Sequence, residues 1–141
     1  MEGITFLDHT ADVKYVVKGE SLEDCFSKAG IGLYMVMCDL KKLKEDKELS
    51  FEVKSKSLES LLYDFLSELI FFVDTENFLG KKVNALNIKK EDDYYLLNVK
   101  LLGQEIKDIT DLEVYSYVKS ATYSDMKIDK DKNEITIVLD I

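Results

Sequence analysis

The stretch "SLESLLYDFLSELIFFVDTE" (Ser57–Glu76) carries apolar side chains that recur at helical spacing. We therefore predict a helix that begins at Ser57. The apolar stripe is too broad for a helix that only lies on the surface of a domain, so this helix is expected to be an organising element of the core. The stripe consists of Leu58, Leu61, Leu62, Phe65, Leu66, Leu69, Phe72 and Val73.

A second helical pattern lies upstream, in "SLEDCFSKAGIGLYMVMCD" (21–39). Ser21 and Asp24 stand in an arrangement that resembles a capping box at its start. The apolar positions again follow helical spacing and predict one buried face. Gly30 and Gly32 weaken the helical propensity of this segment.

Strand-like runs surround the two helical segments at 4–7, 13–18, 48–54, 83–89, 94–102, 114–123 and 134–141. The acidic stretches "EDDY" (91–94) and "DKDKNE" (129–134) are expected to be hairpin connections. This order lacks the regular strand–helix alternation of a doubly wound sheet. It favours an α+β two-layer sandwich, with a mixed or antiparallel β-sheet and both helices packed on one face. With no proline, linker or repeat, residues 1–141 are expected to form one domain.

The charge composition limits the classes of partner. There are 28 acidic and 19 basic residues, giving a net charge of −9, and every basic residue is a lysine. Since arginine is the usual fork for phosphate and guanine recognition, direct binding of nucleic acid is not expected, and docking on a basic protein surface is. No apolar run approaches the length of a membrane span, and the start lacks a signal-peptide pattern, so no membrane association and a cytoplasmic location are expected. Cys25 and Cys38 are expected to be reduced core thiols.

Two ends of strand-like runs carry candidate site residues. His9 and Asp12 could be a structural cap, or less favourably an acid–base pair, and no Ser or Cys is placed to complete a nucleophilic relay. Asp140 and the main-chain carboxylate of Ile141 place two anionic groups side by side. If Asp12 lay near them, three oxygen donors would converge, a set that suits Mg²⁺, Mn²⁺ or Ca²⁺ rather than zinc.

Lys119 is the remaining candidate. On a strand, Val118 and Lys119 would face opposite sides, so Lys119 is either a solvent-facing lysine or a cation placed near an anionic substrate or partner. The sequence offers no complete set of nucleophile, base and oxyanion donors, so an enzyme is the least favoured class.

Four motifs, "DHTAD" (8–12), "LESLLYDFLSELIFFVDTE" (58–76), "VKSATYSDMKI" (118–128) and "LDI" (139–141), occur in an order that resembles the archease family over essentially the whole chain. The resemblance implies a similar α+β fold and a non-catalytic protein cofactor. Its partner would be the RtcB-type 3′-phosphate RNA ligase of tRNA splicing and RNA repair, whose guanylylation and multiple turnover it promotes. The alternative that the family suggests is a chaperone or modulator of a tRNA methyltransferase.

The resemblance also implies roles for single residues. Asp12, Asp140 and Ile141 would hold a divalent cation, Lys119 would contact the partner or its nucleotide during activation, and His9 would order the first motif. The chain departs from the family pattern at Ser120 and Ser124, where alanine and histidine are usual. A histidine usual before this strand is also missing from "IKDITDLEV" (106–114).

Overall fold

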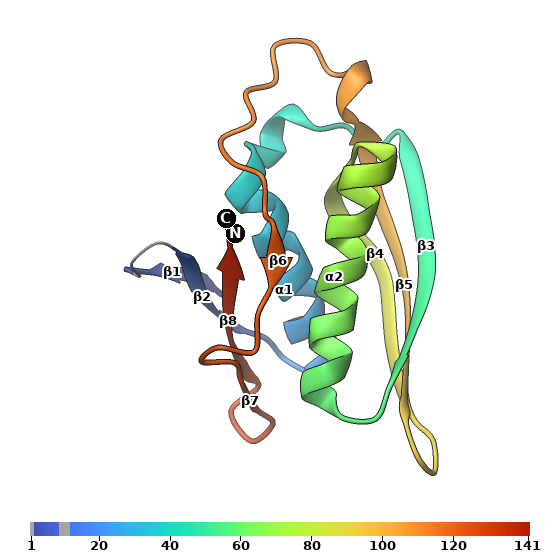
Figure 1. The fold of residues 1–141 in the computed structure, drawn as a ribbon. Helices are drawn as coiled ribbons and strands as arrows, with labels where there is room; N and C mark the ends of the chain where they lie inside the picture. Colours follow the sequence, from blue (N-terminus) through green and yellow to red (C-terminus); the bar gives the residue numbers. More distant parts are fainter. Residues whose placement is uncertain (1, 9–11) are drawn as a thin grey trace.

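The computed structural model describes residues 2–8 and 12–141 (Figure 1). The helices are α1 (Leu22–Met37) and α2 (Leu58–Glu76), with short 3-10 helices η1 (Leu40–Lys42) and η2 (Ile106–Asp108). The strands are β1 (Ile4–Leu7), β2 (Asp12–Lys18), β3 (Lys47–Ser55), β4 (Phe78–Lys90), β5 (Tyr95–Glu105), β6 (Ser120–Ala121), β7 (Lys127–Asp129) and β8 (Glu134–Asp140).

The strands divide into two antiparallel sheets. One has five strands in the order β1-β2-β8-β6, with β7 also paired to β8, and the other has three in the order β3-β5-β4. Figure 1 shows α1 and α2 between the two sheets, and both helices contact strands of both. The α+β class and the antiparallel pairing are therefore confirmed, whereas the strands form two sheets where one was expected.

The reason for two sheets lies in the breadth of the helical stripes. Phe65 of α2 packs against Phe26 of α1 and also against Phe51 of β3, with ring centroids 6.3 and 6.1 Å apart. On the other side of the helices, Ala121 of β6 and Leu139 of β8 are buried in the same core. A helix that is apolar over more than one face must be covered from more than one direction, and two sheets provide that cover.

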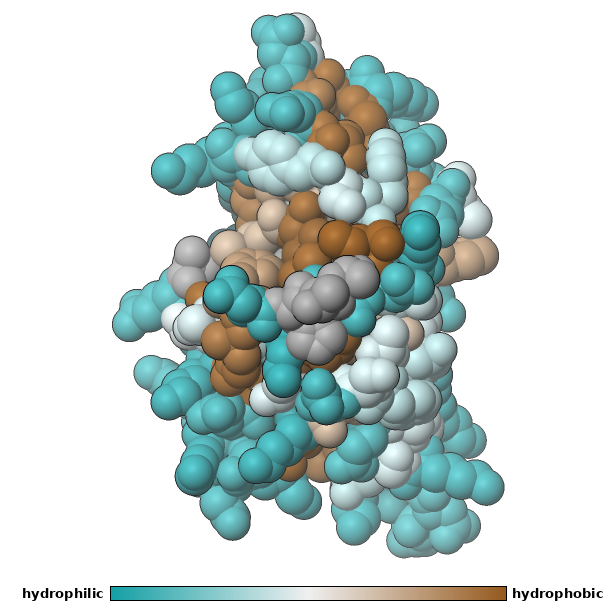
Figure 2. Space-filling model, turned by 60° about the vertical axis from the view of Figure 1, so that its left-hand side comes forward, coloured by the Kyte–Doolittle hydropathy of each residue, from teal (hydrophilic) through white to brown (hydrophobic). Residues whose placement is uncertain are grey.

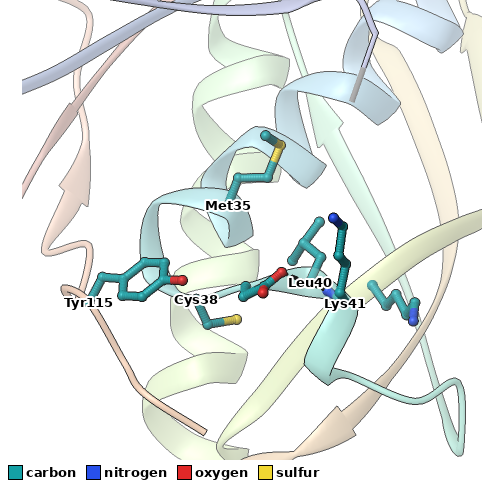
Figure 3. A pocket seen from close by; sticks show the side chains of 7 residues that line it. Met35, Cys38, Leu40, Lys41 and Tyr115 are labelled. Atoms are coloured by element: carbon teal, nitrogen blue, oxygen red, sulfur yellow. Dashed lines mark hydrogen bonds between the residues drawn. The ribbon is translucent and has the colours of Figure 1, made fainter.

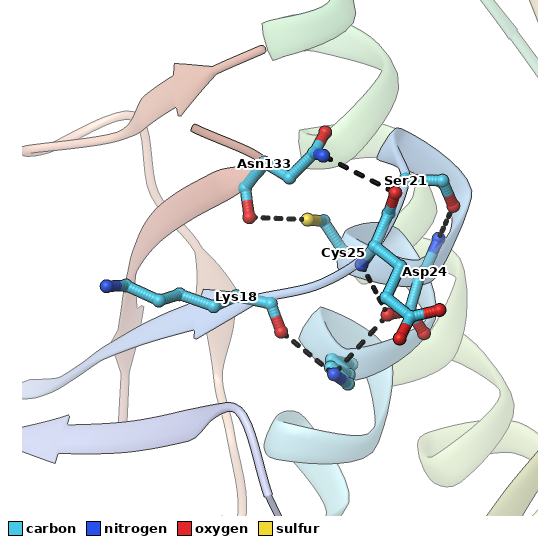
Figure 4. Close-up of polar contacts among 7 residues, drawn as sticks. Lys18, Ser21, Asp24, Cys25 and Asn133 are labelled. Atoms are coloured by element: carbon cyan, nitrogen blue, oxygen red, sulfur yellow. Dashed lines mark hydrogen bonds and ion pairs between the residues drawn. The ribbon is translucent and has the colours of Figure 1, made fainter. Parts of the chain in front are cut away.

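The helix starts agree with the sequence. Ser57 caps α2 through a reciprocal capping box with Ser60. Ser21 caps α1 by accepting a hydrogen bond from the Asp24 N–H, 3.0 Å long, and the Asp24 carboxylate in turn accepts from the Glu20 N–H. Figure 4 shows this end of α1, where the Cys25 thiol also donates to the Asn133 carbonyl in the β7–β8 connection. Such contacts satisfy the unpaired donors of the first helical turn and attach α1 to the five-stranded sheet.

The glycines of α1 allow close approach rather than flexibility. A Cβ on Gly32 would lie 2.5 Å from the ring of Tyr15 on β2, so only glycine fits there. Tyr15 is fully buried, and its hydroxyl donates to the Ala29 carbonyl at 2.7 Å. The residue that lowers helical propensity therefore lets the helix lie directly on the five-stranded sheet.

The strand expected at 114–123 is wrong in its extent, because only Ser120–Ala121 pair as a strand. The preceding residues bridge two elements instead. The Tyr115 N–H donates to the carbonyl of Met37 at the end of α1, and the Lys119 N–H donates to the Asp140 carbonyl, both at 2.7 Å. The two hairpin connections expected at 91–94 and 129–134 are confirmed.

Candidate functional site

The register of the five-stranded sheet places Asp12 directly opposite Asp140. Asp12 is the first residue of β2 and Asp140 the last of β8, and Ser120 of β6 is the partner of Asp140 on its other side. Partners in an antiparallel register project to the same face of a sheet. Asp12, Asp140 and Ser120 therefore form one row across three strands, which we call the carboxylate row.

The carboxylate row lies on the face that points away from the helices. Leu139 and Ile137, which alternate with Asp140 along β8, are fully buried in the core, as is Tyr15 on β2. Since successive residues of a strand face opposite sides, the hydrophobic pattern of these two strands directs both aspartates outward. Figure 2 brings this side of the molecule forward and shows hydrophobic atoms exposed there among hydrophilic ones.

The carboxylate row presents oxygen donors of the kind that bind divalent cations. Like charges directly opposite on neighbouring strands repel one another, with Cβ atoms about 5 Å apart, unless a cation lies between them. Carboxylate oxygens suit Ca²⁺, Mg²⁺ or Mn²⁺. Within residues 2–8 and 12–141, no group of three or more His, Cys, Asp or Glu side chains is arranged to hold a metal. A cation between Asp12 and Asp140 would therefore need a further oxygen, such as one of Ile141.

Lys119 adjoins this row. Its backbone N–H donates to the Asp140 carbonyl, and its side chain is exposed while that of Val118 is buried. Val118 therefore belongs to the core, whereas Lys119 is accessible to solvent. The structure therefore brings Asp12, Asp140, Ile141 and Lys119 to one end of β8. His9, the remaining candidate, lies outside the described residues.

One charged neighbour was missed by the sequence analysis. Lys14 lies two residues after Asp12 on β2, on the same face of the sheet, and its ammonium is 3.5 Å from the Asp125 carboxylate. The Asp125 carboxylate therefore provides an opposite charge for Lys14 on this face. The signal was available, because the spacing Asp-Val-Lys places both charged side chains on one side of a strand.

The comparisons with known proteins cover nearly the whole chain, including the carboxylate row. The model of the family described as "Archease protein family (MTH1598/TM1083)" matches residues 5–141. The chain belongs to the archease family. A protein archease from Methanosarcina barkeri is 33% identical over 96% of this chain and 94% of that protein, and one from Thermococcus gammatolerans is 37% identical over 87% of this chain and 85% of that protein.

The archease fold is also shared with a solved structure. The solution structure of Methanobacterium thermoautotrophicum protein 1598 superposes with a TM-score of 0.82, at 29% identity and over 100% of both chains. The family recognised from the four motifs and the α+β architecture are thereby confirmed. The names of these archease relatives denote no reaction.

A pocket lies at the end of α1 (Figure 3). Its volume is about 450 Å³, and its lining includes Met35, Cys38 and Tyr115. Burial, with the adjacent Asp39 carboxylate, raises the pKa of the Cys38 thiol to about 11. The thiol is therefore protonated at neutral pH, whereas the thiolate is the nucleophilic form of cysteine. Both cysteines are free and buried, as predicted.

Among the helices of the described residues, none combines the length and the apolar character needed to cross a bilayer.

Proposed function

We propose that this chain is a non-catalytic, metal-binding activator of an RtcB-type 3′-phosphate RNA ligase in tRNA splicing or RNA repair, promoting its guanylylation and multiple turnover. One observation carries the proposal: Asp12 and Asp140 face one another across β2 and β8, with Lys119 bonded to the same end of β8. Family membership supports it, because the same residues occupy the motifs through which the chain resembles archeases.

The proposed roles follow from charge and position. Asp12, Asp140 and Ile141 would hold a divalent cation, Ca²⁺, Mg²⁺ or Mn²⁺, which would neutralise the repulsion between the two side chains. The hydrogen bond between the Lys119 N–H and the Asp140 carbonyl holds Lys119 at a fixed distance from that group. The exposed ammonium of Lys119 can then meet an anionic group of the partner, such as a nucleotide phosphate.

The charge of the chain supports a protein partner. With a net charge of −9 and no arginine, the domain repels a phosphate backbone and attracts a basic protein surface. An activator of this kind contacts the ligase and leaves RNA binding to it.

The test is RNA ligation with the cognate ligase held well below the substrate concentration. We expect product to rise from about one equivalent per ligase to many when the chain is added. Asp12→Asn and Lys119→Ala are expected to remove this stimulation. Asp131→Asn, which alters an exposed aspartate of the β7–β8 connection, is the matched control and is expected to leave it intact.

Two results would contradict the proposal. Unchanged product with an active ligase would remove the activator role, and full stimulation by Asp12→Asn would remove the metal site. In the first case, protection of a tRNA methyltransferase against aggregation, measured in EDTA, would favour the chaperone alternative.

A further inference from the structure

The outer side of α2 combines exposed aromatic rings with acidic side chains. In Figure 1, α2 lies at the front of the molecule with its outer side uncovered and β6 beside it. We use the name acidic–aromatic face for the side chains that project from this side of α2 together with the tyrosine stacked on them. They are Tyr63, Asp64, Glu68, Phe71, Asp74 and Tyr123.

The aromatic part of this face is ordered and accessible. The rings of Tyr63 and Tyr123 stack with centroids 4.4 Å apart and an interplanar angle of 4°. Tyr123 is nevertheless 55% exposed, and Phe71 is 53% exposed. Exposed apolar patches that are surrounded by polar residues are typical of interaction sites. Tyrosine is favoured at interfaces because it supplies contact area with few rotatable bonds.

The charged part of the face has one sign. Helix α2 contains five acidic residues and no basic one. In the described part of the chain, none of these five carboxylates takes part in an ion pair, although Ser55 donates a hydrogen bond to Asp64. Desolvation by burial, with smaller contributions from the Asp64 carboxylate and Tyr63, raises the pKa of Tyr123. The negative charge of Asp64 therefore acts on the ring of Tyr123.

We propose that the acidic–aromatic face is the docking surface for a basic, arginine-bearing segment of the partner protein. Guanidinium groups stack on tyrosine rings and bind carboxylates through two parallel hydrogen bonds, so one side chain type matches both halves of the face. Nucleic acid also stacks on tyrosines, but its phosphates would be repelled by Asp64, Glu68 and Asp74. Charge complementarity thus favours a protein.

The face is continuous with the carboxylate row. Helix α2 contacts β6, and Lys119 and Tyr123 lie on either side of that strand in the chain. A partner seated on α2 would therefore extend naturally toward Lys119 and Asp140. This inference rests on the proposed function for the identity of the partner, the RNA ligase, and adds the surface by which it is held.

The test separates binding from activation. Binding of the fluorescently labelled chain to the intact ligase is measured directly, and activation is measured in the ligation assay. The charge-reversal pair Glu68→Lys/Asp74→Lys and the ring variant Tyr123→Ala are compared with Asp92→Lys/Asp93→Lys. The control reverses two exposed charges in the β4–β5 connection. Thermal melting confirms that each variant folds.

We expect both face variants to weaken binding about tenfold or more, since arginine and aromatic contacts dominate interface energies. Saturating amounts of either variant should still give full activation, and the control should match the original chain. Binding of the original chain should weaken with rising salt, because the contact is electrostatic.

The outcomes are distinguishable. A chain that binds the ligase but does not activate it would overturn the proposed function, and the face variants would still decide the docking surface. Unchanged binding by both face variants, or no binding by the original chain, would overturn the docking inference. RNA binding that Tyr123→Ala abolishes would assign the face to nucleic acid and overturn it as well.

Discussion

The two sheets differ in how long their strands run. The strands of the three-stranded sheet contain 9, 13 and 11 residues, and Leu97, Val99 and Leu101 of its central strand β5 alternate into the core. The strands of the five-stranded sheet contain only 4, 7, 2, 3 and 7 residues. Long ladders bury a continuous apolar face, whereas short strands leave many ends where polar groups reach the surface.

Because of this difference, one sheet mainly stabilises the core and the other carries the candidate site. The three-stranded sheet carries none of the candidate site residues, and the five-stranded sheet carries Asp12 and Asp140 at strand ends. Substitutions in the first sheet should therefore change the free energy of unfolding, and substitutions at the ends of the second should change cation and partner responses.

The largest effect is expected from a cavity in the three-stranded sheet. Leu101 is fully buried between Leu49 and Val83 on the neighbouring strands. Leu101→Ala should lower the free energy of unfolding by about 2–5 kcal/mol, measured by urea denaturation. Leu102→Ala, which alters the less buried neighbour, should cost less. A loss below about 1 kcal/mol for Leu101→Ala would contradict the stabilising role of the three-stranded sheet, because large-to-small changes in a packed core cost more.

The next effect tests the carboxylate row. At a cation concentration of about 100 times the Kd, the original chain should gain about 2.7 kcal/mol of stability, and Asp140→Asn should gain little. In EDTA the order should reverse, because Asp140→Asn relieves about 0.2–1 kcal/mol of like-charge repulsion. Asp131→Asn should behave as the original chain does. The free energy of unfolding is measured by urea denaturation with and without each cation. Equal curves for the original chain and Asp140→Asn would refute a cation between the two carboxylates.

An effect of about 3 kcal/mol by about pH 11 is expected in alkali, since the pKa of Cys38 lies about 2.5 units above its unfolded value and each pKa unit corresponds to about 1.4 kcal/mol. Burial and Asp39 raise the pKa of Cys38 to about 11. The unfolded thiol loses its proton at lower pH, about 8.5. The folded state therefore binds the proton more tightly, and stability present below about pH 8.5 is lost as the pH rises toward 11.

The measurement is the free energy of unfolding from pH 7 to 11. The chain should lose stability over this range more steeply than Cys38→Ser, whose hydroxyl does not titrate there. Parallel profiles for the two proteins would show that the Cys38 thiol does not contribute to the pH dependence of stability. Cys25, at the other end of α1, is a second thiol whose pKa is raised by burial, so its contribution to the same pH profile can be compared with that of Cys38.

The smallest effect is expected at a helix cap. Ser57 begins α2 directly after the three-stranded sheet's β3, in a capping box with Ser60. Ser57→Ala should lower the free energy of unfolding by about 1 kcal/mol. Ser67→Ala in the middle of the same helix should be neutral or slightly stabilising, because alanine is the better helix former. Equal effects at both serines, measured by urea denaturation, would argue against the cap.

Both helices, their capping serines and the two hairpin connections could be read from the sequence, because periodicity and capping depend on residues a few positions apart. The division into two sheets could not be read, since strand partners are chosen by contacts between distant segments. The same limit explains segment 114–123. Its strand-like composition is real, but the bonds of Tyr115 to Met37 and of Lys119 to Asp140 determine its path.

The sequence by itself determined the helices, the negative charge, the family motifs and the identity of the candidate site residues. Only the tertiary structure decided that Asp12 stands opposite Asp140 and that Tyr123 stacks on Tyr63. The physical reason is register. Tyr15 and Ile137, partners on β2 and β8, are both buried against the helices. A slip by one residue would turn every such side chain to the outer face, so burial of the core fixes the pairing that brings the two carboxylates together.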